Sequence, residues 1–134
     1  MDLRLELVVL PVADVDRAKE FYVERMGFRL DVDHRAGEDF RVVQATPPGS
    51  ACAVALMRNE GAAGSVQGLH LVVADLVAAR EELRARGVPV SDPFHFGPEG
   101  QAPGLHPDRS DHASFAAVAD PDGNGWLLQE VAER

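Results

Sequence analysis

The sequence predicts an α+β fold made of two tandem copies of one βαβββ unit. Two observations favour it: an internal repeat, and the same order of strand and helix signals in both copies. Laying Asp14 over Asp75 brings identical residues together at six offsets, which are Leu10 with Leu71, Val12 with Val73, Ala13 with Ala74, Ala18 with Ala79, Glu20 with Glu81 and Arg25 with Arg86. Internal repetition of this kind indicates duplicated structural units. We therefore expect a single domain, with module one at about residues 1–58, a linker at 59–66 and module two at 67–134.

Each copy opens with a short, valine-rich apolar run, at residues 5–12 and 69–73. Runs this short and rich in β-branched residues favour a strand over a helix. Asp14 and Asp75 follow these runs. Each suits the N-cap of a helix, because an Asp side chain accepts hydrogen bonds from the first unpaired helix amides.

A helix should follow each Asp. Apolar residues recur three or four positions apart, the spacing of one helix face. They are Val15, Ala18, Tyr22 and Met26 in the first copy, and Leu76, Ala79 and Leu83 in the second. Gly27 and Gly87 come where these patterns stop, and they suit the left-handed residue that ends many helices.

Strand signals fill the rest of each copy. Phe28, Leu30 and Val32 alternate with charged residues, which predicts a half-exposed strand. The other expected strands flank the turn sequences Pro-Pro-Gly and Asp-Pro-Asp-Gly-Asn, and they are residues 40–45, 51–57, 115–119 and 126–131. Residues 91–112 break the symmetry, because their four prolines and three glycines predict a long loop that acts as a lid or mobile flap.

Charge and composition argue against several classes of partner. The chain has 13 Lys and Arg against 22 Asp and Glu, a net charge of −9. We expect neither a nucleic acid nor a membrane as partner, since both recruit basic surfaces. The longest apolar run, residues 7–13, is far shorter than the roughly 20 residues that span a bilayer. Cys52 is the only cysteine, so no disulfide can form within the chain, and we expect a cytoplasmic protein.

Three segments carry a family resemblance, and they are residues 7–18 with Phe21, Tyr22, Gly27 and Phe28, residues 69–90, and residues 119–124. They resemble the vicinal oxygen chelate superfamily, which includes glyoxalase I, bleomycin-resistance proteins, fosfomycin-resistance enzymes and extradiol dioxygenases. The resemblance covers essentially the whole chain, and within the superfamily the chain is most similar to small glyoxalase-like proteins of unassigned activity. It implies two βαβββ modules whose mixed sheets curl into a cup, and a homodimer.

The resemblance also implies where metal-dependent members hold a divalent metal, through one His and one Glu from each module. In this sequence those positions are occupied by Leu7, Ala53 or Ala55, Gly68 and Leu127. None of these side chains can ligate a metal. A shift of two residues supplies only His70 and Gln129, and an amide is a weak ligand. We therefore expect no cofactor, with a divalent metal disfavoured.

His70 is the leading candidate for a catalytic or ligand-binding residue. Strand alternation puts it on the face of Gly68, the inner wall of the implied cup, where its counterpart in the first copy is Val9. It either contacts a ligand or hydrogen-bonds to a neighbour across the sheet. Gln129 shares the face of Leu127 by the same alternation, with the same two alternatives.

Three further groups of residues each allow a functional and a structural interpretation. Arg41 and Gln44 face opposite ways on one strand, so at most one points inward. Arg41 would anchor an anionic substrate if it faces inward, and would be a solvated charge if it faces outward. Trp126 should point away from the cup, into the core. The long segment also contains three histidines, His95, His106 and His112. Their spacing matches no metal motif, so they indicate a solvated loop or a lid that donates one His to the cup.

These observations predict a glyoxalase-like protein that binds a small organic molecule in its cup without metal. Leu7, Val9 and Leu127 would form the apolar wall, with His70 and Gln129 as polar groups. Such a protein would sequester its ligand, as resistance proteins do, or carry out mild acid–base chemistry through His70, which leaves open whether it is an enzyme. One alternative is a structural or regulatory dimer without a ligand. The other is a metal-dependent lyase or dioxygenase with relocated ligands, drawn from His70, Glu6, Glu130 and the loop histidines.

Overall fold

A computed structural model describes residues 1–132 of the 134-residue chain. It contains two mixed sheets, one of four strands and one of five, and few helices. The predicted α+β class is confirmed. The chain divides into two compact units: unit 1 is Met1–Val66 with Asp120–Asn124, and unit 2 is Gln67–Ala119 with the chain from Gly125 onward. Within the described part of the chain, no helix is both long and apolar enough to cross a membrane.

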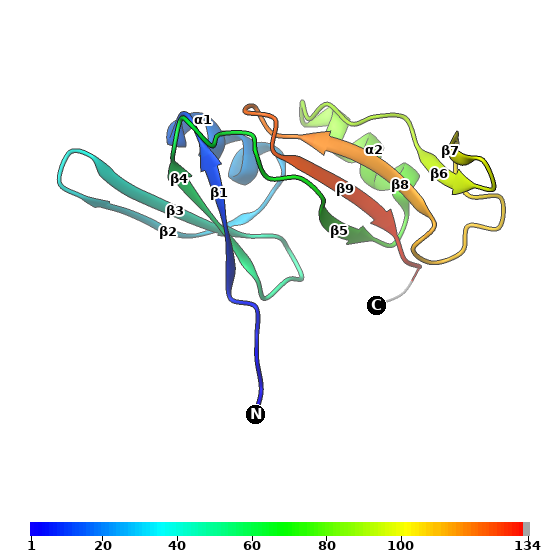
Figure 1. Cartoon of the computed structure of the whole chain (residues 1–134), viewed down its shortest axis with the longest axis horizontal. Helices are drawn as coiled ribbons and strands as arrows, with labels where there is room; N and C mark the ends of the chain where they lie inside the picture. The colour runs from blue at the N-terminus through cyan, green and yellow to red at the C-terminus, as the bar shows by residue number, and fades with distance from the viewer. Residues whose placement is uncertain (133–134) are drawn as a thin grey trace. The chain divides into compact units, whose positions relative to one another are not determined.

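Unit 1 contains the four-stranded sheet, in the order β1-β4-β3-β2 (Figure 1). Its elements are β1 (Leu7–Val12), α1 (Val15–Lys19), the π-helix η1 (Glu20–Arg25), β2 (Arg29–Ala36), β3 (Phe40–Thr46) and β4 (Ala53–Arg58). Strand β1 runs parallel to β4, while the other two pairings are antiparallel.

Unit 2 contains the five-stranded sheet, in the order β5-β9-β8-β6-β7. Its elements are β5 (Leu69–Val73), α2 (Leu76–Ala85), β6 (Phe94–Gly97), β7 (Gly100–Pro103), β8 (Ser114–Ala119) and β9 (Gly125–Glu130). Without β7, the strand order repeats that of unit 1, and β5 again runs parallel to its neighbour β9. The sequence repeat therefore corresponds to two βαβββ units, as predicted.

The helix boundaries follow from local chemistry. The Asp14 side chain accepts a hydrogen bond from the Arg17 amide at 3.2 Å, and Asp75 accepts from the Ala78 amide at 3.1 Å. Each carboxylate thereby satisfies an amide that lacks a partner in the first helical turn. Gly27 has a φ of +80°, the left-handed conformation that ends a helix at little cost for glycine.

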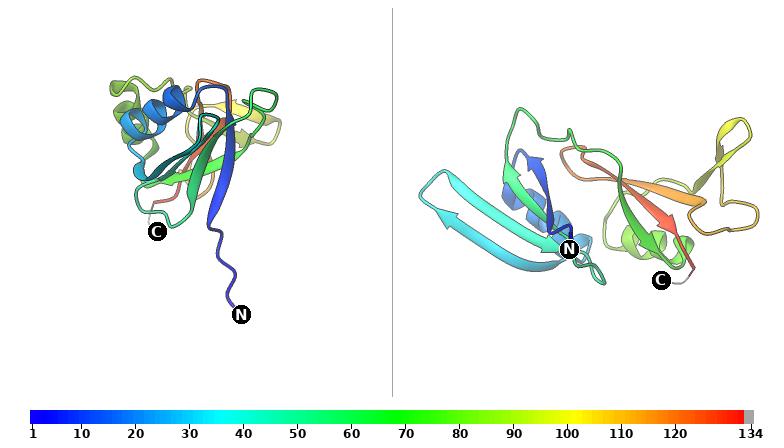
Figure 2. Two further views of the ribbon diagram at one scale, coloured as in Figure 1. Left: turned by 90° about the vertical axis from the view of Figure 1, so that its left-hand side faces the viewer. Right: turned by 60° about the horizontal axis from the view of Figure 1, so that its bottom comes forward.

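Each sheet has one face against a helix and one open face (Figure 2). In unit 1 the buried residues of the two helices are Val15, Ala18, Phe21 and Tyr22. Together with Met26, the C-cap of η1, they pack on the face that carries Leu10, Val12, Val43 and Leu56. In unit 2, α2 packs on β8 and β9, over the face that carries Trp126 and Leu128. Trp126 is 4% exposed, so the prediction that it enters the core is confirmed.

The turn Asp120–Asn124 is held to unit 1 by buried hydrogen bonds. The Tyr22 hydroxyl donates to Asp120 Oδ2 at 2.8 Å, and Asn124 Nδ2 donates to the Pro11 carbonyl at 2.9 Å. Asp120 also accepts from the amides of Asp122 and Asn124, both at 2.9 Å. These contacts explain why a segment between two strands of unit 2 clusters with unit 1.

Two expectations about the strands are wrong. Residues 91–112 are not one long loop, because they contain the hairpin β6–β7, in which Phe94 pairs with Phe115 of β8 on one side and with Pro103 on the other. Strand β2 is not half-buried, because every residue in it is exposed, and Leu30 keeps 40% of its surface. It is an edge strand, and a register shift between Leu30 and Val32 interrupts the alternation on which the prediction rested.

Candidate functional site

The open face of the five-stranded sheet brings together most of the predicted polar and apolar candidates of unit 2. His70 lies opposite Leu127, and Leu127 lies opposite Ala117. In the neighbouring row, Val72 lies opposite Gln129, which in turn lies opposite Phe115 and, beyond it, Phe94. Directly paired residues point to the same face of a sheet. Leu127 and Gln129 are half-buried, whereas Trp126, Leu128 and Glu130 on the other face are buried.

Three phenylalanines form an aromatic cluster on this open face. The rings of Phe94 and Phe115 are stacked, with centroids 5.8 Å apart and planes 21° from parallel. Phe96 meets Phe115 edge-on at 5.6 Å and Phe94 at 6.0 Å. Phe96 is 57% exposed, while Phe115 is only 8% exposed. The cluster therefore has a packed base and one ring that presents its surface to solvent.

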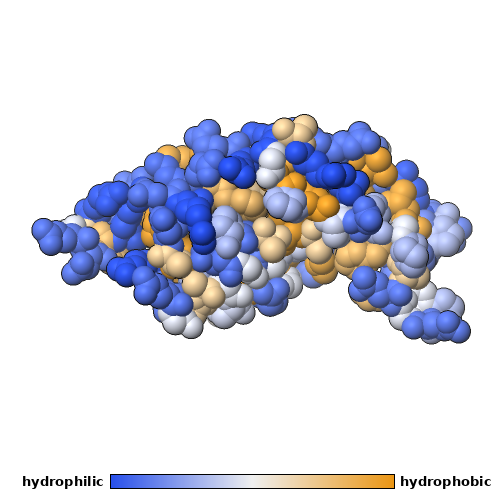
Figure 3. Space-filling view, turned by 90° about the horizontal axis from the view of Figure 1, so that it is seen from above, coloured by the Kyte–Doolittle hydropathy of each residue, from blue (hydrophilic) through white to orange (hydrophobic). Residues whose placement is uncertain are grey.

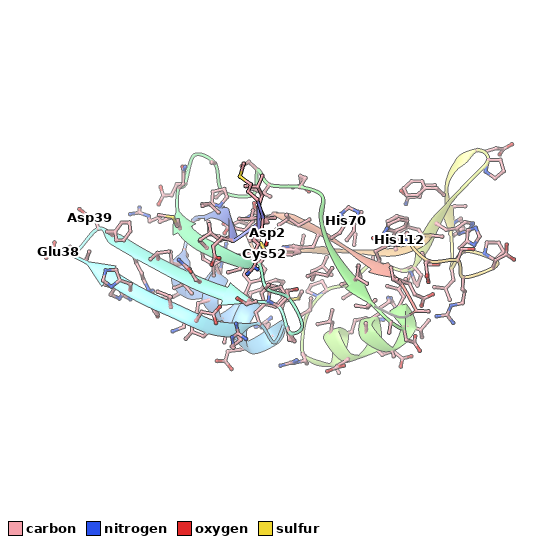
Figure 4. The ribbon with its side chains drawn as sticks, turned by 90° about the horizontal axis from the view of Figure 1, so that it is seen from below. Asp2, Glu38, Asp39, Cys52, His70 and His112 are labelled. Atoms are coloured by element: carbon pink, nitrogen blue, oxygen red, sulfur yellow. The ribbon has the colours of Figure 1, made fainter. Side chains whose placement is uncertain are left out.

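His70 lies at the edge of the aromatic cluster. Its ring meets that of Phe115 at 6.3 Å and an angle of 85°, and its Nδ1 is 2.7 Å from the Gly68 carbonyl oxygen. A carbonyl can only accept, so Nδ1 carries the hydrogen. His70 is otherwise exposed on β5 (Figure 4). The polar His70 ring thus lies beside an apolar aromatic surface.

Gln129 connects this face to the chain before β8. Its Nε2 donates to the His112 carbonyl oxygen at 3.3 Å, and the His112 amide donates to the Glu130 carbonyl oxygen at 2.9 Å. His112 itself has a φ of +66°, a left-handed conformation that is uncommon for a non-glycine residue. The segment before β8 is therefore fixed against β9 at the end of the candidate site.

Leu7 and Val9 lie in unit 1, on the open face of the four-stranded sheet. Leu7 is opposite Ala53, and Val9 is opposite Ala55, which is opposite Gln44. Val9 is 48% exposed. These two residues share a face with each other, and the expectation that they form one wall with Leu127 stays a prediction.

Arg41 lies on the other face of the four-stranded sheet, beside α1. Its guanidinium pairs with Asp16 of α1 and with Asp33 of β2, the latter at 2.9 Å, and its side chain is 13% exposed. Hydrogen bonds from Arg41 and then from Lys19 hold the pKa of Asp33 well below its usual range. Arg41 is therefore paired within unit 1, on the face opposite Gln44.

A cleft of about 340 Å³ lies beside these ion pairs in unit 1, lined by Ala13, Asp14, Val15, Asp16, Arg35, Glu38, Asp39, Arg41, Arg58 and Glu60. The surface at the tip of the β2–β3 hairpin is hydrophilic (Figure 3). Arg58 pairs with Glu60 at 2.7 Å, and Arg41 is paired as described above. The cleft is therefore lined by acidic and basic side chains, several of them in ion pairs, at an exposed surface. The candidate residues on the open faces of the sheets are not among its lining residues.

The comparison with known families decides the family of the chain. The model of the Glyoxalase/Bleomycin resistance protein/Dioxygenase superfamily matches residues 4–128. The chain belongs to this superfamily. A solved structure, TnmS3, described as an antibiotic binding protein from Streptomyces sp. CB03234, is 30% identical, with a TM-score of 0.75 and 96% of each chain covered.

Two further relatives have similar lengths. A glyoxalase/bleomycin resistance protein from Streptomyces sp. CB03234 is 32% identical, with a TM-score of 0.70, and the match covers 95% of this chain and 100% of that chain. The uncharacterized protein YetH of Bacillus subtilis (strain 168) is 26% identical over 126 residues, which is 92% of this chain and 94% of that protein. The superfamily resemblance inferred from the sequence is confirmed.

The strand register decides between the two positions considered for the first-module Glu. His70 and Val9 each lie five residues before an N-cap Asp, His70 is opposite Leu127, and Val9 is opposite Ala55. Ala55 is therefore the structural counterpart of Leu127, and Ala53 is not. Gly68 lies just before β5 with a φ of +83°.

The residues present do not fit the metal of metal-dependent superfamily members. In residues 1–132, no three or more His, Cys, Asp or Glu side chains come together as a group that could hold a metal ion. Glu130, one of the relocated ligands considered, is buried and accepts hydrogen bonds from Arg109 and from the Leu76 amide. His95, a second, has its Nδ1 2.8 Å from the Gly104 carbonyl oxygen, and Glu6 is exposed.

Sequence reasoning missed the aromatic cluster. Phe94 and Phe96 lie in the segment expected to be a loop, and Phe115 was treated only as the start of a strand. The signal was present as the alternation Phe94-x-Phe96, which puts both rings on one face of a strand. The surrounding prolines and glycines concealed it.

Proposed function

We propose that this superfamily member binds a small, partly apolar organic molecule on the open face of its five-stranded sheet, without a metal, and sequesters it as resistance-type binding proteins do. One observation carries the proposal: the exposed Phe96 ring and its partners lie beside His70 on the sheet face opposite the one that packs against α2. An apolar surface with a few polar groups is the usual composition of a small-molecule site.

The likeness to TnmS3 supports the sequestering role. TnmS3 is described as an antibiotic binding protein, and it matches this chain at 30% identity over nearly its full length. Sequestration needs no catalytic group, so it accommodates apolar residues at Leu7, Ala55 and Leu127 where metal-dependent members place ligands. His70 remains available as a polar contact and is the one candidate for acid–base chemistry.

The energetics favour an aromatic or fused-ring ligand. A flat molecule that removes about 100 Å² of apolar surface from water at the Phe cluster gains roughly 2.5 kcal/mol, at about 25 cal/mol per Å². Ring-on-ring contact adds roughly 0.5–1.5 kcal/mol beyond the buried area. Aliphatic ligands of the same size would lack the second contribution.

Calorimetric titration of EDTA-treated protein with a panel of aromatic and aliphatic antibiotics tests the proposal. We expect at least one aromatic member to bind, and Phe96→Ala to weaken its binding by roughly tenfold. The matched control is Val77→Ala, because Val77 is 39% exposed but lies on α2. Binding that survives Phe96→Ala unchanged would place the ligand elsewhere.

The assembly and location are part of the same proposal. A cytoplasmic homodimer fits a sequestering protein that must reach its ligand inside the cell. Sedimentation equilibrium over a range of protein concentrations measures the mass, and a monomer at all concentrations would contradict the dimer.

A further inference from the structure

We propose that the ligand of this face carries a hydroxyl group at the edge of a planar aromatic ring system, and that His70 Nε2 accepts the hydrogen bond from that hydroxyl. This inference rests on the proposed function and adds the chemical class of the ligand to it.

The Gly68 carbonyl fixes the tautomer of His70. Nδ1 lies 2.7 Å from that oxygen and must donate to it. In the neutral imidazole the other nitrogen, Nε2, then has no hydrogen and is an acceptor. Among residues 1–132, no protein group donates to His70 Nε2. An acceptor is therefore available beside the aromatic cluster.

Gln129 contributes a second acceptor to the same face. Its Nε2 donates to the His112 carbonyl, and the reverse orientation of the amide would set two carbonyl oxygens against each other. This contact fixes which end of the Gln129 amide faces His112. The other end, Oε1, accepts no hydrogen bond from the described residues. The two polar side chains of β5 and β9 on this face thus present acceptors to a ligand.

None of the other described residues on this face is charged. They are Val72, Phe94, Phe96, Pro103, Phe115, Ala117 and Leu127, together with the uncharged amide Gln101, which lies opposite Phe96 on β7. A cation would find no carboxylate here, and an anion would find no ammonium or guanidinium. A neutral hydrogen-bond donor attached to a flat apolar body is the complementary chemistry, since an unpaired polar group on the ligand would lose its hydration without compensation.

The geometry favours a planar body over a globular one. Phe94 and Phe115 are stacked nearly parallel, and Phe96 crosses Phe115 with an interplanar angle of 69°. The His70 ring stands at 85° to that of Phe115, with the ring centroids 6.3 Å apart. A ring placed on the phenylalanines could present a substituent at its rim to the imidazole.

A matched pair of probes tests the inference: 2-naphthol and its methyl ether, 2-methoxynaphthalene. They share the fused ring, and only the first has a donor. At about pH 8, we expect wild-type protein to bind 2-naphthol at least tenfold more tightly than the ether. In His70→Phe, which keeps an aromatic ring but removes the acceptor, the ratio should fall to within about twofold. Phe96→Ala should weaken both probes alike.

The outcomes separate this inference from the proposed function. Equal binding of the two probes, with no change of the ratio in His70→Phe, would overturn the hydroxyl contact and leave the aromatic binding face standing. No binding of either probe up to its solubility limit would overturn the face and the inference together. Thermal unfolding of His70→Phe beside Val77→Ala confirms that each variant is folded.

The tautomer has its own spectroscopic readout. Nitrogen-15 spectra of the His70 ring should show a protonated Nδ1 and an unprotonated Nε2 in the protein without ligand. The Nε2 resonance should move when 2-naphthol is added and should stay in place with the ether. A protonated Nε2 in the neutral ring would overturn the inference directly.

Discussion

Gly64 shows how one residue can be fixed by backbone geometry alone. It has a φ of +82°, and a Cβ added there would lie 2.1 Å from the Asp122 carbonyl oxygen. Both the left-handed conformation and the close approach exclude any side chain. We expect Gly64→Ala to lower the free energy of unfolding by about 2 kcal/mol or more.

Gly61 provides the matched control for that substitution. A Cβ at Gly61 would find its nearest atom at 3.8 Å, an ordinary contact, and its φ lies outside the left-handed range. Gly61→Ala should therefore change stability by roughly 0.5 kcal/mol or less, or raise it slightly. Urea unfolding of both variants measures the difference, and an equal effect would contradict the close approach to Asp122.

The sequence could predict some single residues better than others. The sheet face of His70 could be predicted from strand alternation, which is a local pattern, and from the internal repeat. The pairing of His70 with Leu127 agrees with that face. The pairing of Arg41 with Asp16 and Asp33 could not be read from the sequence, because its partners come from a helix and a different strand. Whether Arg41 faces inward depended on the register of β3, which only the sheet reveals.

At the scale of elements, the two N-cap aspartates should act alike. Asp14→Ala and Asp75→Ala each remove an acceptor for a first-turn amide, so each should cost about 1 kcal/mol of stability. Asp14→Asn keeps an acceptor and should cost clearly less. Urea unfolding measures all three, and a loss in Asp14→Asn as large as in Asp14→Ala would point to the charge instead of the cap.

Glu130 ties β9 to α2 and to the segment before β8. Hydrogen bonds from Arg109, together with the Leu76 amide, hold the pKa of this carboxyl below its ordinary value. A group whose pKa is depressed in the folded state stabilises the fold above its unfolded pKa, about 4.3 for Glu, and loses that contribution as the pH falls through the folded pKa.

Glu130→Gln should therefore cost about 2 kcal/mol of stability at neutral pH. The difference from wild type should stay constant down to about pH 5 and shrink at lower pH. Glu81→Gln, on exposed surface of α2, controls for the loss of one carboxylate. Unfolding curves from pH 3 to 7 measure both, and a difference that persists unchanged at pH 3 would contradict the role of the ionised carboxyl.

The hairpin β6–β7 shows why elements near a functional site were harder to predict. Helix caps and glycine ends depend on neighbours within a few residues, so Asp14 and Gly27 were placed correctly. Strand β6 pairs along its length with β7 in a tight hairpin, and its first two residues also pair with β8 some twenty residues later. Its four residues lie among prolines and glycines. Non-local pairing overrides local composition in such segments, and here it also builds the aromatic cluster.

At the scale of the whole molecule, the repeat carries the strongest constraint on chemistry. Duplicated modules place equivalent positions at equivalent points of two sheets, so Val9 with Ala55 corresponds to His70 with Leu127. In both modules the side chains there are apolar except for His70. A metal site needs several ligands, and this face supplies one imidazole whose Nδ1 is already hydrogen-bonded to a carbonyl.

We therefore expect that purified, tag-free protein retains no stoichiometric metal. After incubation with Ni, Zn, Mn or Fe(II) and extensive dialysis, elemental mass spectrometry should find well below one metal per chain, since single imidazole ligands exchange readily. Adding each metal should also leave the affinity for an aromatic ligand unchanged, because the contacts come from Phe96 and His70. A retained stoichiometric metal would contradict the ligand positions inferred at Leu7, Ala55, Gly68 and Leu127. It would make a lyase or dioxygenase assay the next experiment, with His70→Ala showing whether the one histidine on that face holds the ion.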